Sequence, residues 1–408
     1  MNRVVITGLG AVSPVGLSTQ AYWAALTAGQ SGFGPPTIFA AERLNTKVVA
    51  EVKGFVPADH FDARQIGFLD RVSQFAVVAA REAIAQSGLS FRDGLGERTA
   101  AIVGSGIGGQ STQDDNFKRI YGENATRVHP LIIPRTMPNA PASQISMFFG
   151  IKGPTYAVST ACASATHSIG QAFHLVRTGS VTCAVAGGSE AQLTTGTVKA
   201  WEAMRILAPD TCRPFSRERK GMVLGEGAAI LVLESLDHAA ARGADILGEI
   251  VGFGMSADAG DLTAPDPDGM VRAMTATLAD ARLATDAIDY VNAHGTGTTA
   301  NDAAETAALR TAFGTHAGRL AISSTKSMVG HALGAAGALE AVAVVMALRD
   351  GVAPPTMNYL GPDPACDLDC VPNEARRRPL HAALSNSFAF GGLNAVLALR
   401  RFAGPSAR

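Results

Sequence analysis

The sequence lacks an excess of charge of either sign and has no long apolar run. Its 408 residues carry 34 Lys and Arg against 35 Asp and Glu, so the formal net charge is −1. This balance argues against a basic face that binds nucleic acid. No apolar run reaches the roughly 18 residues of a membrane helix without a glycine or a charge, so we expect no membrane insertion. A local cluster fits either an acidic protein partner or a solvated loop: Arg213, Arg217, Arg219 and Lys220.

Cysteine is also scarce, with five residues at scattered positions: 162, 183, 212, 366 and 370. The chain opens on the strand-like run VVITGLG without a charged leader and apolar core, so we expect no signal peptide. An odd number of cysteines without a secretory signal predicts free thiols in a reducing cytoplasm. Cys366 and Cys370 lack a second ligand pair, and we therefore predict no metal site.

Strand-like runs alternate with alanine-rich helical stretches along the chain, which predicts an α/β fold. Apolar residues recur with a period near 3.6 over residues 71–85 and indicate a helix there. The segments GEGAAILVLES and GGLNAVLALRR start 166 residues apart (225 and 391), and both read as a glycine turn into an alternating strand. We therefore predict a duplicated α/β unit whose halves meet near residues 247–253. Two strand-to-helix turns would then face each other in a crevice suited to ligand binding.

One cysteine stands between a strand-like and a helical run, in the segment VSTACASATHSIG. A lone free cysteine is most often a small buried residue. A thiol at a helix N-terminus instead feels the positive end of the helix dipole, which lowers its pKa and favours the thiolate. The small neighbours of Cys162 leave room for a substrate, and a thioester can form reversibly on such a thiol.

Two histidines lie beside glycine-rich turns, His294 in NAHGTGT and His331 in STKSMVGHALGAAG. Each alone fits a hydrogen-bonded structural histidine. Their occurrence together with Cys162 makes all three candidate site residues. His167 follows Cys162 by five residues on one helix, a poor alignment on a helix face, and is interpreted as a packing residue. The segment GSGIGG differs from GxGxxG, so it predicts no nucleotide site.

These motifs together resemble those of the β-ketoacyl-acyl carrier protein synthases, in the synthase II branch of the thiolase superfamily. The matching motifs are TACASA, NAHGTGT, STKSMVGHALGAAGALEA and SNSFAFGG, in this order. The segment KAWEAMRILAPDTCRPFSRERKGMVLGEGAA is similar to the rhizobial nodulation ketosynthases. The resemblance implies a thiolase-like fold in five αβαβα layers. Its two halves would be residues 1–250, with the nucleophile, and residues 251–408, with the two histidines.

The resemblance also implies a reaction, a decarboxylating Claisen condensation that lengthens an acyl chain by two carbons. Cys162 would carry the acyl chain, while His294 and His331 would bind the malonyl thioester and stabilise its enolate. The other implied roles are support of the histidines by Lys326 and Glu340, the oxyanion hole and gate at Phe390 and Phe388, phosphopantetheine contacts at Thr296 and Thr298, and acyl-pocket lining at Ile107 and Trp201.

Both substrates would arrive on acyl carrier protein, a homodimer is expected, and no metal or organic cofactor is implied. One alternative is a non-catalytic partner subunit, a chain-length factor, but such subunits lack the nucleophilic cysteine. Another is a thiolase, which needs a second cysteine near the carboxyl end, and none follows Cys370. The family's usual GFGGTN reads AFGGLN here, with Ala389 and Leu393, which predicts altered gating. General fatty-acid elongation and a dedicated acyl or polyketide pathway both stay open.

Overall fold

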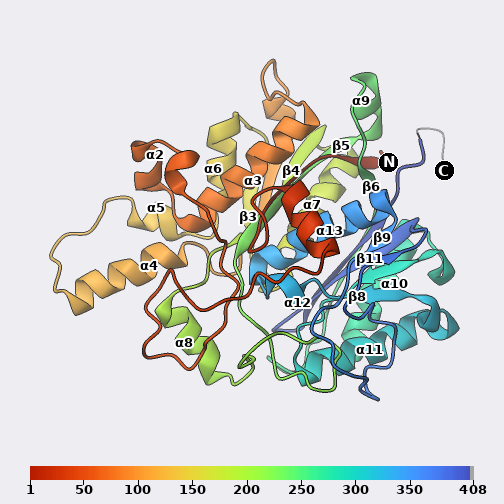
Figure 1. Cartoon of the computed structure of the whole chain (residues 1–408). Helices are drawn as coiled ribbons and strands as arrows, with labels where there is room; N and C mark the ends of the chain where they lie inside the picture. Colours follow the sequence, from red (N-terminus) through yellow and green to blue (C-terminus); the bar gives the residue numbers. More distant parts are fainter. Residues whose placement is uncertain (405–408) are drawn as a thin grey trace.

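The structure is a computed structural model that describes residues 1–404, and its centre is a ten-stranded sheet (Figure 1). Across the sheet the strands are β3 (Thr155–Val158), β2 (Thr99–Gly104), β4 (Cys183–Glu190), β5 (Gly227–Ser235), β1 (Val4–Val12), β6 (Gly248–Ala257), β12 (Leu393–Arg400), β11 (Ala382–Ala389), β7 (Tyr290–Asn292) and β8 (Ala321–Ser323). A separate small sheet pairs β9 (Val352–Ala353) with β10 (Arg376–Arg377). The predicted α/β fold is thus confirmed.

The sheet consists of two equivalent halves that meet where β1 pairs with β6 over three residues, in antiparallel register. In the first half β5 is antiparallel to β1 and to β4, and β4, β2 and β3 are parallel. The second half repeats this with β12 antiparallel to β6 and β11, followed by parallel β7 and β8. The predicted 166-residue offset separates the starts of β5 and β12 (227 and 393) and of β3 and β8 (155 and 321). The division placed after residue 250 lies inside β6.

Helices complete five layers, with α7 (Ser164–Thr178) and α13 (Ala336–Asp350) between the two halves of the sheet (Figure 1). Both helices contact strands of both halves. The outer face of the first half is covered by α3 (Arg71–Ser87) and α6 (Ala140–Phe149), and that of the second half by α10 (Pro267–Ala281) and α11 (Thr299–Phe313). The remaining helices are α1 (Thr19–Thr27), α2 (Ala63–Phe68), α4 (Gln110–Phe117), α5 (Ile132–Thr136), α8 (Thr195–Ala203), α9 (Leu236–Ala241) and α12 (Lys326–Val329).

The two inner helices approach closely because their contact uses small residues. A Cβ atom at Gly337 of α13 would lie only 2.0 Å from Oγ1 of Thr166 on α7, so no larger residue fits there. All residues of α13 from Ala336 to Leu348 are buried, which explains why this helix is apolar on every side apart from Glu340. Within residues 1–404, no helix has the length and apolar character needed to cross a membrane.

Candidate active site

Cys162 lies in the tight turn that joins β3 to α7, two residues before the first residue of the helix. Ala161 adopts a left-handed conformation with φ 48°, and the Ser164 hydroxyl donates to the carbonyl of Ala161 and accepts from the amide of Thr160. This turn closes the chain on itself and directs the cysteine inward, where it is 6 % exposed. The sequence therefore placed the thiol correctly at a helix N-terminus.

The predicted lowering of the thiol pKa is wrong. Burial raises the pKa of Cys162 to about 12, because a thiolate loses its hydration there, and the charge of Glu190 acts in the same direction. The positive charge of Lys326 opposes this shift but does not outweigh burial. Any nucleophilic role for Cys162 therefore requires that its proton leaves as the sulfur attacks, rather than from a preformed thiolate.

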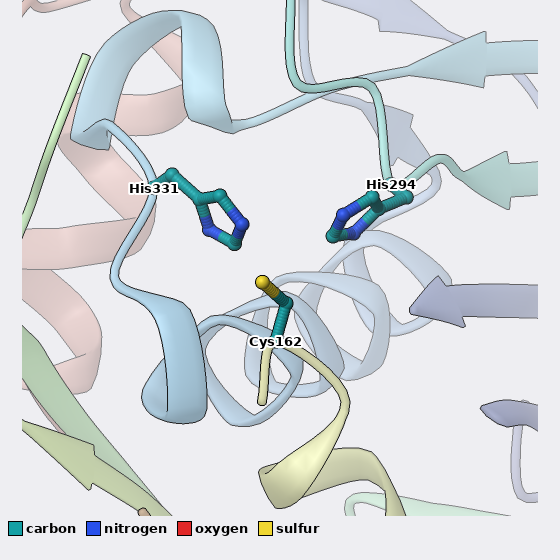
Figure 2. Close-up of side chains that lie close together, drawn as sticks. All are labelled: Cys162, His294 and His331. Atoms are coloured by element: carbon teal, nitrogen blue, oxygen red, sulfur yellow. The ribbon is translucent and has the colours of Figure 1, made fainter. Parts of the chain in front are cut away.

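His294 and His331 face the thiol from two different elements, the loop after β7 and the turn after α12 (Figure 2). Their ring centroids are 5.3 Å apart and the rings are nearly perpendicular, at 81°. One nitrogen of each ring and Sγ of Cys162 all lie within 4.8 Å of one another. Burial, with the charge of Lys326, holds the pKa of both histidines well below its usual range, so both rings are neutral at physiological pH.

His294 is fixed by charged groups behind it. Both carboxylate oxygens of Glu305 on α11 accept backbone bonds, from the amides of His294 and Gly295, each at 2.8 Å. The ammonium of Lys326 donates to the His294 carbonyl at 2.6 Å and lies 3.4 Å from its Nδ1. Because an ammonium only donates, Nδ1 is the acceptor nitrogen of this neutral ring and the proton is on Nε2. Glu305 was not among the residues predicted from the sequence, where its only signal was its place as the seventh residue of α11.

The backbone of His331 is held by hydrogen bonds at both its amide and its carbonyl. Its amide donates to the carbonyl of Val223 at 2.7 Å, and its carbonyl accepts from the amide of Gly225 at 3.0 Å and from Nε2 of Gln192 at 3.1 Å. Gln192 is a second residue that sequence reasoning missed. The ring nitrogen Nδ1 of His331 is buried and has no hydrogen-bond partner among the residues that the structure describes. That nitrogen is free to contact a substrate.

Lys326 and Glu340 lie behind the histidines and form a buried ion pair. They come from the first turn of α12 and from α13, and their side chains are 1 % and 2 % exposed. Burial raises the pKa of the Glu340 carboxyl, and the charge and hydrogen bond of Lys326 act against that rise. The structure thus brings together the pair that the resemblance implied.

The thiol and both rings open into a cavity of about 510 Å³. Five other residues implied by the resemblance line it: Trp201, Thr296, Thr298, Phe388 and Phe390. The hydroxyls of the two threonines are 2.9 Å apart. The Trp201 ring is stacked on that of Phe390, with centroids 6.1 Å apart and an interplanar angle of 28°. Ile107 is not among the lining residues; it is half-buried against the apolar core that includes Cys162.

The two departures from the family's gating sequence lie in paired strands rather than in the turn between them. Ala389 ends β11, Leu393 begins β12, and the two residues are cross-strand partners. The positive φ values belong to Gly391 and Gly392, at 79° and 68°. Ala389 therefore occupies an extended position that any residue adopts, and the expected loss of backbone freedom does not arise in this conformation.

Two further sequence interpretations are settled by contacts. His167 makes only local hydrogen bonds among the described residues, with Nδ1 2.9 Å from the Thr160 hydroxyl and 3.1 Å from the Ala163 carbonyl. This is as expected for a packing residue. Arg219 does not belong to a surface patch. It is buried and paired with Asp302 of α11 and with Asp363. Its guanidinium therefore ties the loop before β5 to α11.

Cys162, His294 and His331 are also close enough to share a metal ion, as are Cys183, Glu234 and His238. The first set has the ammonium of Lys326 beside it, and in the second both carboxylate oxygens of Glu234 already accept bonds from Arg242, His238 and Thr7. A nearby cation opposes metal binding in both places.

A duplicated five-layer fold with one thiol and two neutral imidazoles around one cavity defines a condensing enzyme of the thiolase type. Comparison with known families agrees with this class. Residues 1–239 match the beta-ketoacyl synthase N-terminal domain, and residues 247–360 match the beta-ketoacyl synthase C-terminal domain. The chain belongs to the β-ketoacyl synthase family.

Relatives span the full length of the chain. Nodulation protein E of Rhizobium sp. (strain N33) is 49 % identical over 98 % of this chain and 99 % of its own length. The 3-oxoacyl-[acyl-carrier-protein] synthase 2 of Coxiella burnetii is 44 % identical, with 98 % of each chain covered.

Solved structures have the same fold. The ishigamide ketosynthase/chain length factor superposes with a TM-score of 0.94 at 37 % identity, covering 98 % of this chain and 99 % of that one. A structure of a type II polyketide synthase acyl-carrier protein in complex with its ketosynthase bound to the hexaketide superposes with a TM-score of 0.89 at 31 % identity, with the same coverage.

Proposed function

We propose that this β-ketoacyl synthase is a 3-oxoacyl-[acyl-carrier-protein] synthase, which condenses malonyl carrier protein with an acyl chain bound to Cys162. The observation that carries the proposal is the convergence of the Cys162 thiol with two neutral imidazoles, all within 4.8 Å, in one cavity. A thiol accepts acyl groups as thioesters, and neutral imidazole N–H groups stabilise an oxyanion without a strong base.

The first half-reaction moves the acyl group from the carrier's thiol to Cys162. The sulfur attacks the thioester carbonyl, and its proton passes to the neutral ring of His331 as the new S–C bond forms, because His294 already carries a proton on Nε2 and turns its Nδ1 to Lys326. The negatively charged oxygen of the tetrahedral intermediate then accepts hydrogen bonds from the backbone amides of Cys162 and Phe390, which form the oxyanion hole. The intermediate collapses with release of the carrier's thiolate, which takes the proton. The high pKa of the free thiol is the reason for coupling proton transfer to attack.

The second half-reaction uses both histidines as hydrogen-bond donors. Loss of CO₂ from the malonyl group leaves an enolate, whose oxygen lies between His294 and His331. The lowered pKa of the two rings keeps them neutral, so they bind the enolate oxygen without protonating it. The enolate carbon attacks the Cys162 thioester, a C–C bond forms, and the Cys162 thiolate leaves and takes up a proton from solvent, because its first proton left on the carrier's thiol. The product is a 3-oxoacyl chain longer by two carbons.

The residues along the cavity have roles in this proposal according to their positions. Thr296 and Thr298 contact the phosphopantetheine arm, Phe388 and Phe390 gate the thiol, and Trp201 limits the space for the acyl chain, with Ile107 beside it. Lys326 with Glu340 supports His294. No residue in the proposed steps needs a metal or organic cofactor.

The partner that delivers both substrates is acyl carrier protein, and the chain works as a homodimer. The carrier fits the relative whose name specifies that substrate and the ketosynthase solved with its carrier protein. Dimerisation is favoured at β3, the outer strand of the first half, where Tyr156 is exposed and the contacting helix α6 exposes Met147. The five free cysteines support a reducing compartment such as the cytoplasm.

Pathway and chain length belong to the same proposal. The relatives include both a nodulation protein and a synthase 2, so either a dedicated acyl or polyketide pathway or fatty-acid biosynthesis fits. Mass spectrometry of products from malonyl carrier protein with primers from short to long chain tests the function directly. Elongated 3-oxoacyl products support it, and their length identifies the pathway. No product from any primer would favour the chain-length-factor alternative.

A further inference from the structure

The glycine-rich segment Gly104–Gly109 folds around a carboxylate of the protein itself. Glu190, the last residue of β4, is fully buried. Its Oε1 accepts from the Ser105 hydroxyl at 3.0 Å and from the Ile107 amide at 3.2 Å. Its Oε2 accepts from the amides of Gly106 at 2.7 Å and Gly334 at 2.9 Å. All four donors are neutral, so this carboxylate is held as an anion is held in a backbone cradle, without a cation.

The four donors belong to both halves of the molecule. Three come from the loop after β2, and the fourth, Gly334, lies in the 3₁₀ turn η6 (Leu333–Ala335) that leads into α13, three residues after His331. The contact of Gly334 with Gly106 and Glu190 leaves no room for a side chain at residue 334. A Cβ atom at Gly334 would lie 2.4 Å from the Gly106 amide and 2.5 Å from Oε2 of Glu190. The carboxylate therefore joins the Ile107 loop to the turn that carries His331.

The duplicated topology gives this cradle a counterpart, which is the active-site cavity. By strand order, β4 corresponds to β11, β2 to β7, and the start of α13 to the start of α7. The cavity lies among the end of β11, the loop after β7 with His294, and the start of α7 with Cys162. The cradle lies among the end of β4, the loop after β2, and the start of α13. The same three parts thus form an open cavity in one place and a site filled by Glu190 in the other.

We propose that Glu190 is the built-in anion of this second site, and that its carboxylate positions His331 and the Ile107 loop relative to Cys162. This inference rests on the proposed roles of Cys162 and His331. Glu190 touches no reacting atom and is a positioning residue. Its charge also reaches the site: together with Lys326 and Glu340, it is one of the charged groups that act on the Cys162 thiol.

The test compares Glu190→Gln with the native enzyme in two assays. Glutamine keeps the shape but has one acceptor oxygen, so even with its NH₂ group turned toward the Ser105 hydroxyl that group faces the backbone N–H of Ile107, and the cradle opens. We expect kcat for condensation to fall at least tenfold, with KM for the acyl carrier within about twofold, because positioning rather than binding is lost. The pH midpoint of Cys162 alkylation by iodoacetamide should move to lower pH, since removal of a nearby negative charge favours the thiolate. Gly334→Ala opens the same contact but keeps the carboxylate, so an unmoved midpoint in that variant separates loss of the charge from opening of the cradle.

Two further variants keep the result interpretable. Glu190→Ala should lose condensation and regain part of it in formate, which refills the cradle with a carboxylate. Gly334→Ala should lower kcat as Glu190→Gln does, because its Cβ pushes the same contact apart. Glu234→Gln is the matched control: Glu234 is an equally buried carboxylate, held by Arg242 away from the cavity, and its loss should lower stability without changing kcat.

Native kcat and an unmoved alkylation midpoint in Glu190→Gln would overturn the inference while leaving the proposed function intact. An inactive native enzyme would instead count against the proposed function, whatever the variant does. If Glu190→Gln does not fold, the other two variants are decisive. Formate rescue of Glu190→Ala and a kcat at least tenfold lower in Gly334→Ala support the inference. Native kcat in both variants rejects it.

Discussion

The Lys326 ammonium donates to the backbone carbonyl of His294 at 2.6 Å and lies 3.4 Å from Nδ1 of the same residue. A cation at this distance opposes protonation of the ring, and it is the main cause of the lowered His294 pKa after burial. Lys326 is itself balanced by the buried carboxylate of Glu340. One ion pair therefore both holds the loop of His294 and keeps its imidazole neutral.

Removal of one member of this pair should be far more harmful than removal of both. Lys326→Met leaves Glu340 as an uncompensated buried charge, which costs about 3–5 kcal/mol of unfolding free energy. The double variant Lys326→Met/Glu340→Gln should recover much of that stability, yet decarboxylation should stay at least tenfold slow because His294 loses its support. Urea unfolding and CO₂ release measure the two effects. Equal stability of the single and double variants would contradict the pairing.

Cys162→Ala should abolish acyl transfer and condensation and leave the fold intact. The substitution removes one buried sulfur from a turn made by backbone bonds, so the loss of stability should stay within about 0.5–3 kcal/mol. Intact-protein mass spectrometry after incubation with acyl carrier protein should show no acyl adduct. Cys183→Ala is the control, since Cys183 is a buried free cysteine in β4 that does not line the cavity. Condensation by the Cys162 variant would remove the basis of the proposed function.

His294→Ala or His331→Ala should separate the two half-reactions. Acylation of Cys162 should persist in His294→Ala, because His331 can still take the thiol proton, and should slow in His331→Ala, whereas malonyl decarboxylation should fall by about 10²–10³ in both through loss of an oxyanion donor. Stopped-flow or isotopic CO₂ assays measure the second step, and mass spectrometry the first. His316→Ala serves as a control, since His316 contacts the carbonyl of Ile288 away from the cavity. Changes below tenfold in both variants would rule out the electrostatic role.

The sequence was sufficient for the fold and for the three residues at the centre of the site, and the reason is physical. The other predicted lining residues came from the family resemblance, and one of them, Ile107, does not line the cavity. Alternating strands and helices, a repeated segment and small-residue turns are local patterns, and they predicted the duplicated sheet and the turns that carry Cys162, His294 and His331. Glu305 and Glu190 stand elsewhere in the chain and act on backbone amides, which no local pattern reveals. Likewise the sign of the thiol pKa shift depends on burial, which only the packed structure determines.

Glu305 makes the enzyme sensitive to pH near neutrality. Burial raises its pKa to about 7, and its carboxylate form accepts the amides of His294 and Gly295. Decarboxylation should therefore rise with pH through about 7, and Glu305→Gln should be slower by roughly tenfold or more and lack this rise.

Stability should show the opposite sign. A carboxyl whose folded pKa is raised is stabilising while protonated, and that contribution is lost as pH increases through the folded value, by about 1.4 kcal/mol per pH unit. Glu305→Gln should thus gain stability relative to the native chain as pH rises from the ordinary Glu pKa of about 4.3 to the raised value of about 7, and the difference should stay level above that. Urea unfolding across that range measures the difference, and a constant difference would contradict a raised pKa.

Trp201 should set the chain length that the cavity accepts. Its indole lines the cavity and is stacked on Phe390, so it both fills space and contacts the turn for which we propose a gating role. Trp201→Ala removes that volume and should raise kcat/KM for long primers relative to short ones by tenfold or more, while Trp201→Phe keeps an aromatic partner for Phe390 and should change the ratio only a few fold. Competition between short and long acyl carriers, read by product mass, gives the ratio directly. An unchanged ratio in Trp201→Ala would mean that the acyl chain does not run past this side chain, and Ile107 would then be the residue to vary.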